Sequence, residues 1–221
     1  MHVVVAIPTY NRCSYLKTNI EYFDKQVVSQ DVRLSLAISN SASIDGTEDF
    51  LNGLVAERDN VSIYNKLRDW NGYNYGCLLE AIPKDADWVW LMGDDDYLTD
   101  PKSVEIVCNL IKDQKSDSDF AFVHACQGRR SKNSGDVYVD NVLTLCNEIG
   151  YLEVLGWISS LVIRRDVFEI AISQTYERGL KAKDEPGDAN THSAFFQAGY
   201  LLEALHDKRG ALIDLPLVEP Q

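Results

Sequence analysis

The stretch Asp87-Trp88-Val89-Trp90-Leu91-Met92-Gly93-Asp94-Asp95-Asp96 decides the fold of this 221-residue chain. Its first half is a nearly continuous apolar run, which is typical of a strand buried on both faces of a parallel sheet. Ligands of open α/β sheets bind beyond the carboxyl ends of the strands, so the three aspartates stand where a ligand site is expected. Adjacent carboxylates repel one another unless a cation is present, and hard oxygen ligands suit Mg²⁺ or Mn²⁺.

A solvated loop is the alternative interpretation of the same three aspartates. Asp100 precedes Pro101, where the next helix is predicted to begin, so acidic residues in this region also serve as helix caps. Residues 84–119 carry ten acidic and four basic residues, a net charge of −6 out of −13 for the whole chain. The strand that precedes the aspartates and the pattern of the rest of the chain favour the ligand site.

Outward from this stretch, the hydrophobic pattern alternates between strand and helix. Strands are predicted over residues 3–7, 34–38, 61–64, 87–92 and 120–125, with shorter ones over 136–142 and 159–163. Helices are predicted over 16–27, from an N-cap at Asp45 to 55, and over 72–82, 102–112, 147–155, 166–176 and 192–205, with a polar loop over 181–190. This order predicts an α/β fold with a mostly parallel sheet flanked by helices, followed by a smaller mixed α/β half.

The composition excludes several classes of protein. The chain has 34 acidic and 21 basic residues and shows no basic cluster, which argues against nucleic acid as a partner. Its five cysteines are widely spaced and odd in number, so free thiols in a reducing compartment are expected. No apolar run reaches the roughly 20 residues of a membrane helix, and the N-terminus lacks a basic leader. We therefore expect a cytoplasmic protein with at most peripheral contact to the inner face of a membrane.

Three polar loops are predicted to converge on one edge of the sheet. Residues 8–12 follow the first strand, residues 39–47 follow the second, and the aspartates follow the strand that ends at Met92. The carboxyl ends of parallel strands meet at the same edge, so backbone amides, hydroxyls and carboxylates come together there.

The ordered motifs of these loops resemble the family 2 glycosyltransferases of GT-A fold. They are Pro8-Thr9-Tyr10-Asn11-Arg12, Ser43-x-Asp45-Gly46-Thr47, Gly72-x-Asn74 and Asp94-Asp95-Asp96. The segment Leu91-Met92-Gly93-Asp94-Asp95-Asp96 is similar to a bacterial subgroup that includes abequosyltransferases and other sugar transferases of surface-polysaccharide synthesis. The resemblance is specific over residues 1 to about 100 and weaker beyond. Each motif alone is short, and it is the ordered set at strand ends that carries the resemblance.

The resemblance implies an inverting transfer of a sugar from a nucleoside diphosphate donor to an acceptor hydroxyl. It implies Mn²⁺ or Mg²⁺ as cofactor, held by Asp96 and Asp94. That family usually has Asp where this chain has Asn40, and since an amide both donates and accepts, CDP competes with UDP as the nucleotide. Arg68 is a candidate local cation for the anionic donor. The donor-binding residues are then Pro8, Thr9, Tyr10, Arg12, Asn40, Arg68, Asn74, Asp94 and Asp95.

The general base that the acceptor hydroxyl requires is less well defined by the sequence. Candidates are Asp184, Glu185, Asp188 and His192, in or just after the polar loop before the last helix. The family often has an acidic residue before such a helix, which favours Asp188, with His192 second. A solvated loop followed by a helix cap is the simpler interpretation of each of them.

The resemblance divides the domain into a donor-binding half, residues 1–126, and an acceptor-side half, residues 127–221. Its acceptor is expected to be a glycan or lipid-linked glycan of bacterial lipopolysaccharide or capsule. Residues 215–221 come directly after a last predicted strand. Similar enzymes often continue with C-terminal helices, so truncation after that strand is one expectation. Two alternatives stay open: a sugar-phosphate nucleotidyltransferase, although the glycine-rich phosphate loop is missing, and a nucleotide-sugar-binding domain without catalysis.

Overall fold

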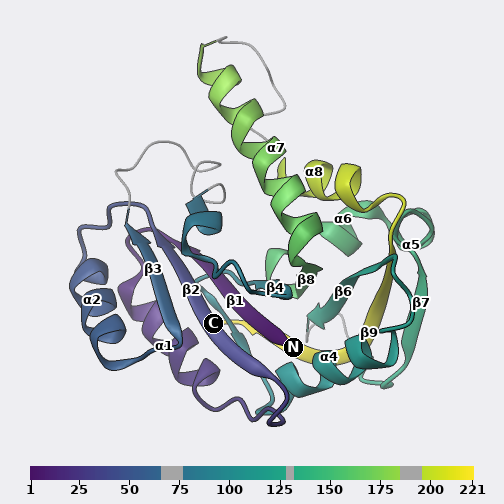
Figure 1. Cartoon of the computed structure of the whole chain (residues 1–221), viewed down its shortest axis with the longest axis horizontal. Helices are drawn as coiled ribbons and strands as arrows, with labels where there is room; N and C mark the ends of the chain where they lie inside the picture. Colours follow the sequence, from purple (N-terminus) through teal and green to yellow (C-terminus); the bar gives the residue numbers. More distant parts are fainter. Residues whose placement is uncertain (66–76, 128–131, 185–195) are drawn as a thin grey trace.

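The computed structural model describes residues 1–65, 77–127, 132–184 and 196–221, and its described strands form one nine-stranded sheet with helices on both faces (Figure 1). The strands are β1 (His2–Thr9), β2 (Arg33–Asn40), β3 (Val61–Asn65), β4 (Trp88–Leu91), β5 (Asp96–Leu98), β6 (Phe120–Gln127), β7 (Val137–Asn141), β8 (Leu161–Arg164) and β9 (Arg209–Pro220). The predicted strands are therefore all present, β5 is an addition, and β9 extends the last predicted strand beyond Leu215.

The sheet is mostly parallel, as predicted. Its order is β3-β2-β1-β4-β8-β6-β9-β5, and β7 pairs with β9. β1 is parallel to β2 and β4, β2 is parallel to β3, and β6 is parallel to β9. β8 runs antiparallel between β4 and β6, and both β5 and β7 are antiparallel to β9. The carboxyl ends of the first four strands therefore meet at one edge.

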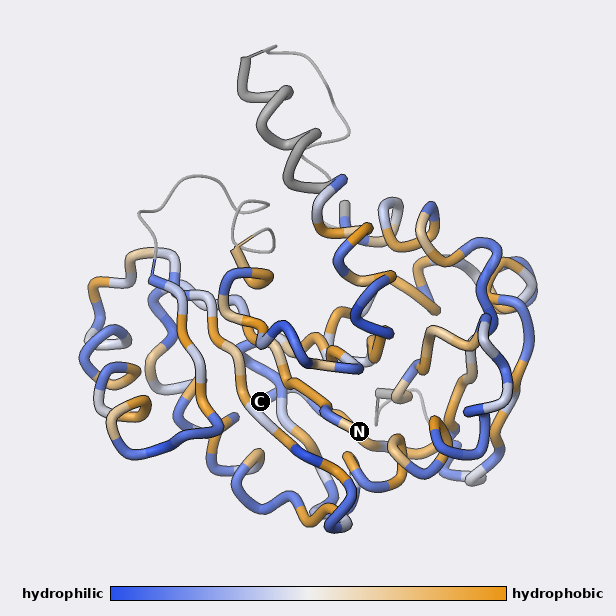
Figure 2. The backbone as a smooth tube through the Cα atoms, viewed as in Figure 1, coloured by the Kyte–Doolittle hydropathy of each residue, from blue (hydrophilic) through white to orange (hydrophobic). Residues whose placement is uncertain are grey.

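Helices cover both faces of the sheet and enclose one hydrophobic core on each. They are α1 (Cys13–Phe23), α2 (Thr47–Glu57), α4 (Ser103–Asp113), α5 (Val142–Ile149), α6 (Tyr151–Leu155), the 3-10 helix η1 (Ile158–Ser160), α7 (Arg165–Asp184) and α8 (Phe196–Leu205), and residues 77–81 are also helical. Side chains of α1, α2 and α4 pack in one core, and those of α5 to α8 pack in the other. Figure 2 shows hydrophobic residues along the central strands and hydrophilic ones in many surrounding turns.

The apolar runs in the sequence become central strands because both of their faces are covered. In β1, Val3, Val5 and Ile7 face one core while Val4 and Ala6 face the other. All four residues of β4 are buried, with Trp88 and Trp90 in one core and Val89 and Leu91 in the other, which confirms the predicted burial of this strand on both faces. Burying a large apolar side chain stabilises the fold by about 1.5–3 kcal/mol. The buried strand therefore fixes the position of the aspartates that follow it.

Two predicted helix boundaries in the first half are wrong. α1 ends at Phe23 rather than continuing to Val27, whose side chain is 62% exposed and whose backbone N–H donates to Pro101 of another loop. The N-cap of α2 is Gly46, with a left-handed φ of 88°, and not Asp45. The Asp45 carboxylate instead accepts hydrogen bonds from the backbone of Thr47 and of Cys13, so it joins two loops.

The second half of the chain differs more from prediction than the first. The helix predicted over 147–155 is two helices, α5 and α6, separated by Gly150 at a φ of 109°. Ser159 and Ser160 lie in η1 and not in a strand. α7 continues to Asp184, four residues into the predicted polar loop. The chain end from Leu215 onward belongs to β9 and does not follow the last strand.

The remaining predictions fall partly outside the described residues. Of the helix predicted over 72–82, residues 77–81 are helical, and α8 begins at Phe196 where 192–205 was predicted. All five cysteines are free thiols, as predicted. Within the described part of the chain, no helix is long and apolar enough to cross a membrane.

Candidate functional site

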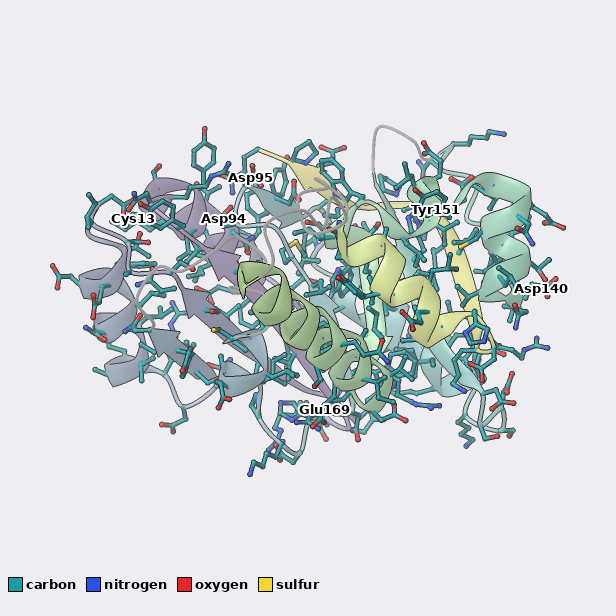
Figure 3. All side chains as sticks on the ribbon, turned by 90° about the horizontal axis from the view of Figure 1, so that it is seen from above. Cys13, Asp94, Asp95, Asp140, Tyr151 and Glu169 are labelled. Atoms are coloured by element: carbon teal, nitrogen blue, oxygen red, sulfur yellow. The ribbon has the colours of Figure 1, made fainter. Side chains whose placement is uncertain are left out.

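The candidate site lies where the carboxyl ends of β1, β2, β3 and β4 meet. Thr9 is paired in register with Asn40, and Asn40 with Asn65, so three polar residues end three adjacent strands. β4 continues on the other side of β1 into the turn that carries the aspartates. Figure 3 labels Asp94 and Asp95 close to the start of α1. The parallel sheet thus assembles residues that are up to 87 positions apart in the sequence.

Asp94 is held by the first loop from two directions. The Thr9 hydroxyl donates to Asp94 Oδ2 at 2.8 Å, and both residues are buried. The Arg12 guanidinium donates to Asp94 Oδ1 at 3.2 Å. Arg12 also forms an ion pair with Asp95, while its side chain remains 45% exposed. Arg12 is therefore the cation that offsets two of the three carboxylates, and it keeps one side open to a ligand.

Asp96 is held by residues from other elements. The Ser159 hydroxyl of η1 donates to Asp96 Oδ2 and accepts the backbone N–H of Gly93 at 2.8 Å. On the other side, the Asn19 side chain of α1 donates to the carbonyls of Gly93 at 3.0 Å and of Asp96 at 2.6 Å. The 93–96 turn is thus fixed between α1 and η1.

Burial dominates the electrostatics of the carboxylates. Burial, opposed by the Ser159 hydrogen bond and aided by the charges of Asp95 and Asp94, raises the pKa of Asp96 to about 6. Burial also raises the pKa of Asp94, against the Thr9 hydrogen bond and the charge of Arg12. Burial lowers the pKa of Arg12, but the two aspartates outweigh it and leave that pKa above its ordinary value. The site therefore favours an added positive charge.

Asn40 lies deep in the site and is fully buried. Its amide oxygen accepts from the Ser43 backbone at 3.2 Å and from the Ser43 hydroxyl at 2.6 Å. Its amide nitrogen donates to Asn65 at 3.0 Å. Since an amide nitrogen has two hydrogens, one donor remains among the contacts that the described residues make.

Two loops of the site are tied together by Asn11. Its backbone N–H donates to the Ser43 hydroxyl at 2.8 Å, and its side-chain oxygen accepts the Ile44 N–H at 2.8 Å. Asn11 has a φ of 53°, in the left-handed region that asparagine tolerates better than most residues. The chain reversal after β1 therefore depends on this residue, and Arg12, which follows it, reaches Asp94 and Asp95.

A divalent cation fits the residues present. No group of three or more His, Cys, Asp or Glu is arranged to hold a metal anywhere in the described ranges. Mg²⁺ and similar ions, however, commonly bind through one or two carboxylates and complete their shell with substrate phosphates. Two buried carboxylates with raised pKa values, Asp94 and Asp96, suit an ion that arrives with a diphosphate.

The structure brings together Pro8, Thr9, Tyr10, Arg12, Asn40, Asp94, Asp95 and Asp96 at this edge. Arg68, Asn74, Glu185, Asp188 and His192 lie outside the described residues, and Asp184 is the last residue of α7. Sequence reasoning missed Asn19 and Ser159. Asn19 left a signal, because it is a polar residue within the buried stripe of α1, whereas Ser159 left none.

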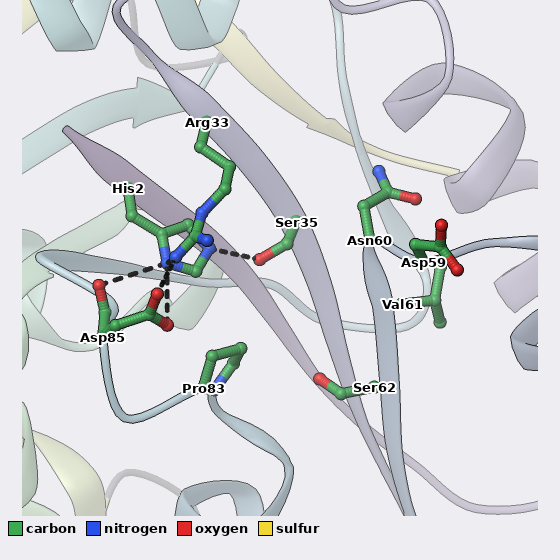
Figure 4. A pocket seen from close by; sticks show the side chains of 9 residues that line it. All are labelled: His2, Arg33, Ser35, Asp59, Asn60, Val61, Ser62, Pro83 and Asp85. Atoms are coloured by element: carbon green, nitrogen blue, oxygen red, sulfur yellow. Dashed lines mark hydrogen bonds and ion pairs between the residues drawn. The ribbon is translucent and has the colours of Figure 1, made fainter.

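A second cavity, of about 420 Å³, lies at the opposite edge of the sheet (Figure 4). Its lining includes His2, whose Nδ1 accepts from the Arg33 guanidinium at 2.5 Å and whose Nε2 shares a hydrogen bond with the Ser35 hydroxyl at 2.7 Å. Burial lowers the pKa of His2, which keeps the ring neutral near pH 7. The carboxylates in its lining, Asp59 and Asp85, are exposed, so this cavity lacks the buried carboxylate pair that makes the carboxyl edge a match for a cation with a diphosphate.

Comparison with known proteins agrees with the geometry of the carboxyl edge. Residues 4–170 match the family model described as Glycosyl transferase family 2. The chain is 25% identical over 182 residues to the abequosyltransferase RfbV of Salmonella typhimurium, covering 75% of this chain and 54% of that protein. The chain thus spans about half the length of the curated relative that it matches.

Solved structures of glycosyltransferases share the fold. TarS residues 1–349 of S. aureus superimpose with a TM-score of 0.67 at 12% identity, covering 100% of this chain and 60% of that one. The same protein in complex with UDP-GlcNAc gives 0.66 at 16% identity, covering 97% and 56%. The mannosyltransferase PcManGT from Pyrobaculum calidifontis, in complex with GDP-Man and Mn²⁺, gives 0.61 at 14% identity, covering 99% and 56%. The predicted GT-A fold is confirmed.

Proposed function

We propose, from the premise that this chain belongs to glycosyl transferase family 2, that it is the catalytic domain of an inverting, metal-dependent sugar transferase. The donor is a nucleoside diphosphate sugar, with UDP as the first candidate nucleotide and CDP as the second. The acceptor is a hydroxyl of a glycan or lipid-linked glycan. The similarity to an abequosyltransferase supports a role in bacterial lipopolysaccharide or other surface glycan synthesis.

The observation that carries this proposal is the meeting of Thr9, Arg12 and the three aspartates at the carboxyl edge of four parallel strands. Two buried carboxylates provide ligands for a cation, and a partly exposed guanidinium provides a second positive group for phosphate oxygens. The complexes of structural neighbours with UDP-GlcNAc, and with GDP-Man and Mn²⁺, support a nucleotide-sugar donor and a metal.

In the proposed mechanism each residue has a separate task. Asp96 and Asp94 would hold a divalent cation, which when bound would supply Lewis-acid stabilisation of the charge on the departing diphosphate. Asp95, with a side chain 46% exposed, contacts the donor. Arg12 exchanges its contacts with the aspartates for phosphate oxygens. Thr9 keeps the Asp94 carboxylate oriented through its hydrogen bond.

The acceptor hydroxyl must attack from the face opposite the leaving diphosphate and lose its proton. We propose Asp188 as the general base and His192 as the second candidate, since both precede α8 and an acidic or imidazole side chain matches the chemistry. Asp188→Asn is expected to abolish transfer while sparing nucleotide binding. Near-normal turnover in that variant would reassign the base.

Isothermal titration with UDP and with CDP, each in Mn²⁺ and in EDTA, tests the donor half of the proposal. We expect one nucleotide to bind about 10-fold more tightly in Mn²⁺, which corresponds to about 1.4 kcal/mol. Asp96→Ala is expected to lose that difference. Asp59→Asn, which removes an exposed carboxylate between α2 and β3, is the control and should bind as wild type. Failure of the folded wild type to bind either nucleotide would overturn the proposal.

Asn40→Asp tests which base the site reads. The substitution exchanges the remaining amide donor for a carboxylate acceptor, which complements the N3–H of uracil and not the bare N3 of cytosine. We expect the ratio of UDP affinity to CDP affinity to rise by about 10-fold, the value of one hydrogen bond to a charged group. Titration of both nucleotides against both proteins measures the ratio, with Asn60→Asp on the surface as the control. An unchanged ratio in folded protein would remove Asn40 from base recognition.

A further inference from the structure

We infer that Ser159 is a positioning residue: its hydroxyl holds the Asp96 carboxylate so that one oxygen faces the cation and the other faces the protein. This inference rests on the proposed function, because it concerns the same metal-dependent site. Ser159 is 63 positions from Asp96 and belongs to η1, outside the motifs of the first hundred residues.

The hydroxyl of Ser159 forms hydrogen bonds with both ends of the turn over residues 93–96, the aspartate turn. It donates to Asp96 Oδ2 and accepts from the backbone N–H of Gly93 at 2.8 Å. A hydroxyl has one hydrogen and two lone pairs, so these two contacts use the donor and one acceptor. The carbonyl of Ser159 accepts from Trp90 Nε1 at 2.8 Å, which fixes the same residue to β4. Ser159 therefore joins β4, the turn and Asp96.

The packing around the Ser159 hydroxyl leaves the Asp96 carboxylate little room for another rotamer. Ser159 is fully buried and Asp96 is 3% exposed. A Cβ atom at Gly93 would lie 2.8 Å from Asp96 Oδ2 and 3.3 Å from Ser159 Oγ, so glycine is needed for the carboxylate to sit there. Asn19 holds the backbone of the turn, but it contacts carbonyls and leaves the Asp96 side chain to Ser159.

Without the hydroxyl, two buried polar groups lose their partner in the described contacts. The Gly93 N–H would be unsatisfied, and Asp96 Oδ2 would lose its donor. The carboxylate is then free to rotate toward another rotamer and to present the wrong oxygen to the cation. Residues that orient a metal ligand commonly contribute 10–100-fold to metal affinity. The expected effect of removing the hydroxyl is therefore on the cation's contribution to binding, with the nucleotide's own contacts unchanged.

Ser160 offers a matched control. It is the next residue of η1, it is also fully buried, and its hydroxyl bonds the Trp157 carbonyl at 2.8 Å and His124 at 3.0 Å. Ser160→Ala thus removes the same group from the same helix without touching Asp96. Loss of a buried hydroxyl destabilises each variant comparably, by an amount that thermal unfolding of both proteins measures.

The experiment is titration of wild type, Ser159→Ala and Ser160→Ala with the nucleotide that the wild type binds, in Mn²⁺ and in EDTA. We expect the Mn²⁺-dependent gain in affinity to fall about 10-fold in Ser159→Ala and to persist in Ser160→Ala, with EDTA affinities equal in all three. Equal gains in all three proteins would overturn the inference and leave the proposed function standing. Absence of nucleotide binding by the wild type would overturn both.

Ser159→Cys separates hydrogen bonding from packing and serves if the alanine variant fails to fold. A thiol fills the space of the hydroxyl, being somewhat larger, but donates weakly. If the hydroxyl positions Asp96, the cysteine variant loses nearly as much of the Mn²⁺-dependent gain as alanine does. Wild-type behaviour of Ser159→Cys would assign the residue a packing role only.

Discussion

Replacing Asp96 with asparagine is expected to raise the stability of the metal-free protein and to abolish sugar transfer. Asp96 is a buried carboxyl beside two others, and its pKa is raised from 3.8 to about 6. A carboxyl whose folded pKa lies above its unfolded pKa stabilises the fold at low pH, and that stability is lost as the pH rises through about 6. Asparagine has no charge to bury, so it avoids the loss.

The free energy of unfolding of Asp96→Asn is expected to exceed that of the wild type by an amount that grows with pH. Below about pH 4, Asp96 is protonated in both states and the two proteins should have similar free energies of unfolding. Above about pH 7, the variant should be more stable by about 3 kcal/mol, since each pKa unit is worth about 1.4 kcal/mol. Denaturant unfolding in EDTA at pH 4, 6 and 8 measures the difference. Asp59→Asn, on the surface, should show no such trend.

Asp96→Asn is expected to raise stability but to lower the rate of sugar transfer. An amide is a neutral and weaker ligand than a carboxylate, so Asp96→Asn loses the proposed cation and with it the stabilisation of the leaving group, at a cost of about 10³-fold or more in kcat. Mn²⁺ with nucleotide should raise the unfolding midpoint of the wild type and not that of the variant. A variant that is both less stable at pH 8 and still active would show that Asp96 carries neither the unfavourable charge nor the cation.

The donor side of the site was predictable because it depends on local sequence and on sheet topology. An apolar run that stops at Gly93 and Asp94 marks a buried parallel strand, and parallel strands present their carboxyl ends together. Thr9, Arg12 and Asn40 follow two such strands, and the structure places them beside the aspartates. Both the α/β fold and this grouping therefore follow from patterns a few residues long.

The supports of the site were not predictable in the same way, because they depend on contacts between distant segments. Ser159 reaches Asp96 only because β8 inserts antiparallel beside β4, and nothing in the local pattern around Ser159 indicates that insertion. The short strand β5 was missed because it needs β9, more than a hundred residues later, as its partner. Asn19 is intermediate, since a polar residue on a buried helix face indicates a contact without indicating its partner.

Gly156→Ala is expected to have the largest effect on stability of any single-methyl change at this end of the domain. A Cβ atom there would lie 2.4 Å from the backbone carbonyl oxygen of Leu152, and a rigid backbone atom cannot move aside as a side chain can. The φ of Gly156 is −79°, so the requirement for glycine comes from the close approach and not from a left-handed backbone. The carbonyl of Gly156 also accepts from Gln197 of α8, at 3.1 Å, so a shift here disturbs α6 and α8 together.

Overpacking of a buried site costs typically 1–3 kcal/mol, and a backbone clash belongs at the upper end. We therefore expect a loss of about 3 kcal/mol, or about 6–12 °C in the unfolding midpoint of a domain of this size. Gly53→Ala is the matched control: it lies inside α2 with nothing within 4 Å of its added Cβ, and it should gain about 0.5–1 kcal/mol. Since η1 begins two residues after Gly156, the same shift should displace Ser159 and reduce the Mn²⁺-dependent gain in nucleotide affinity. A Gly156→Ala protein with wild-type stability and affinity would show that α6 and η1 adjust independently of the aspartate turn.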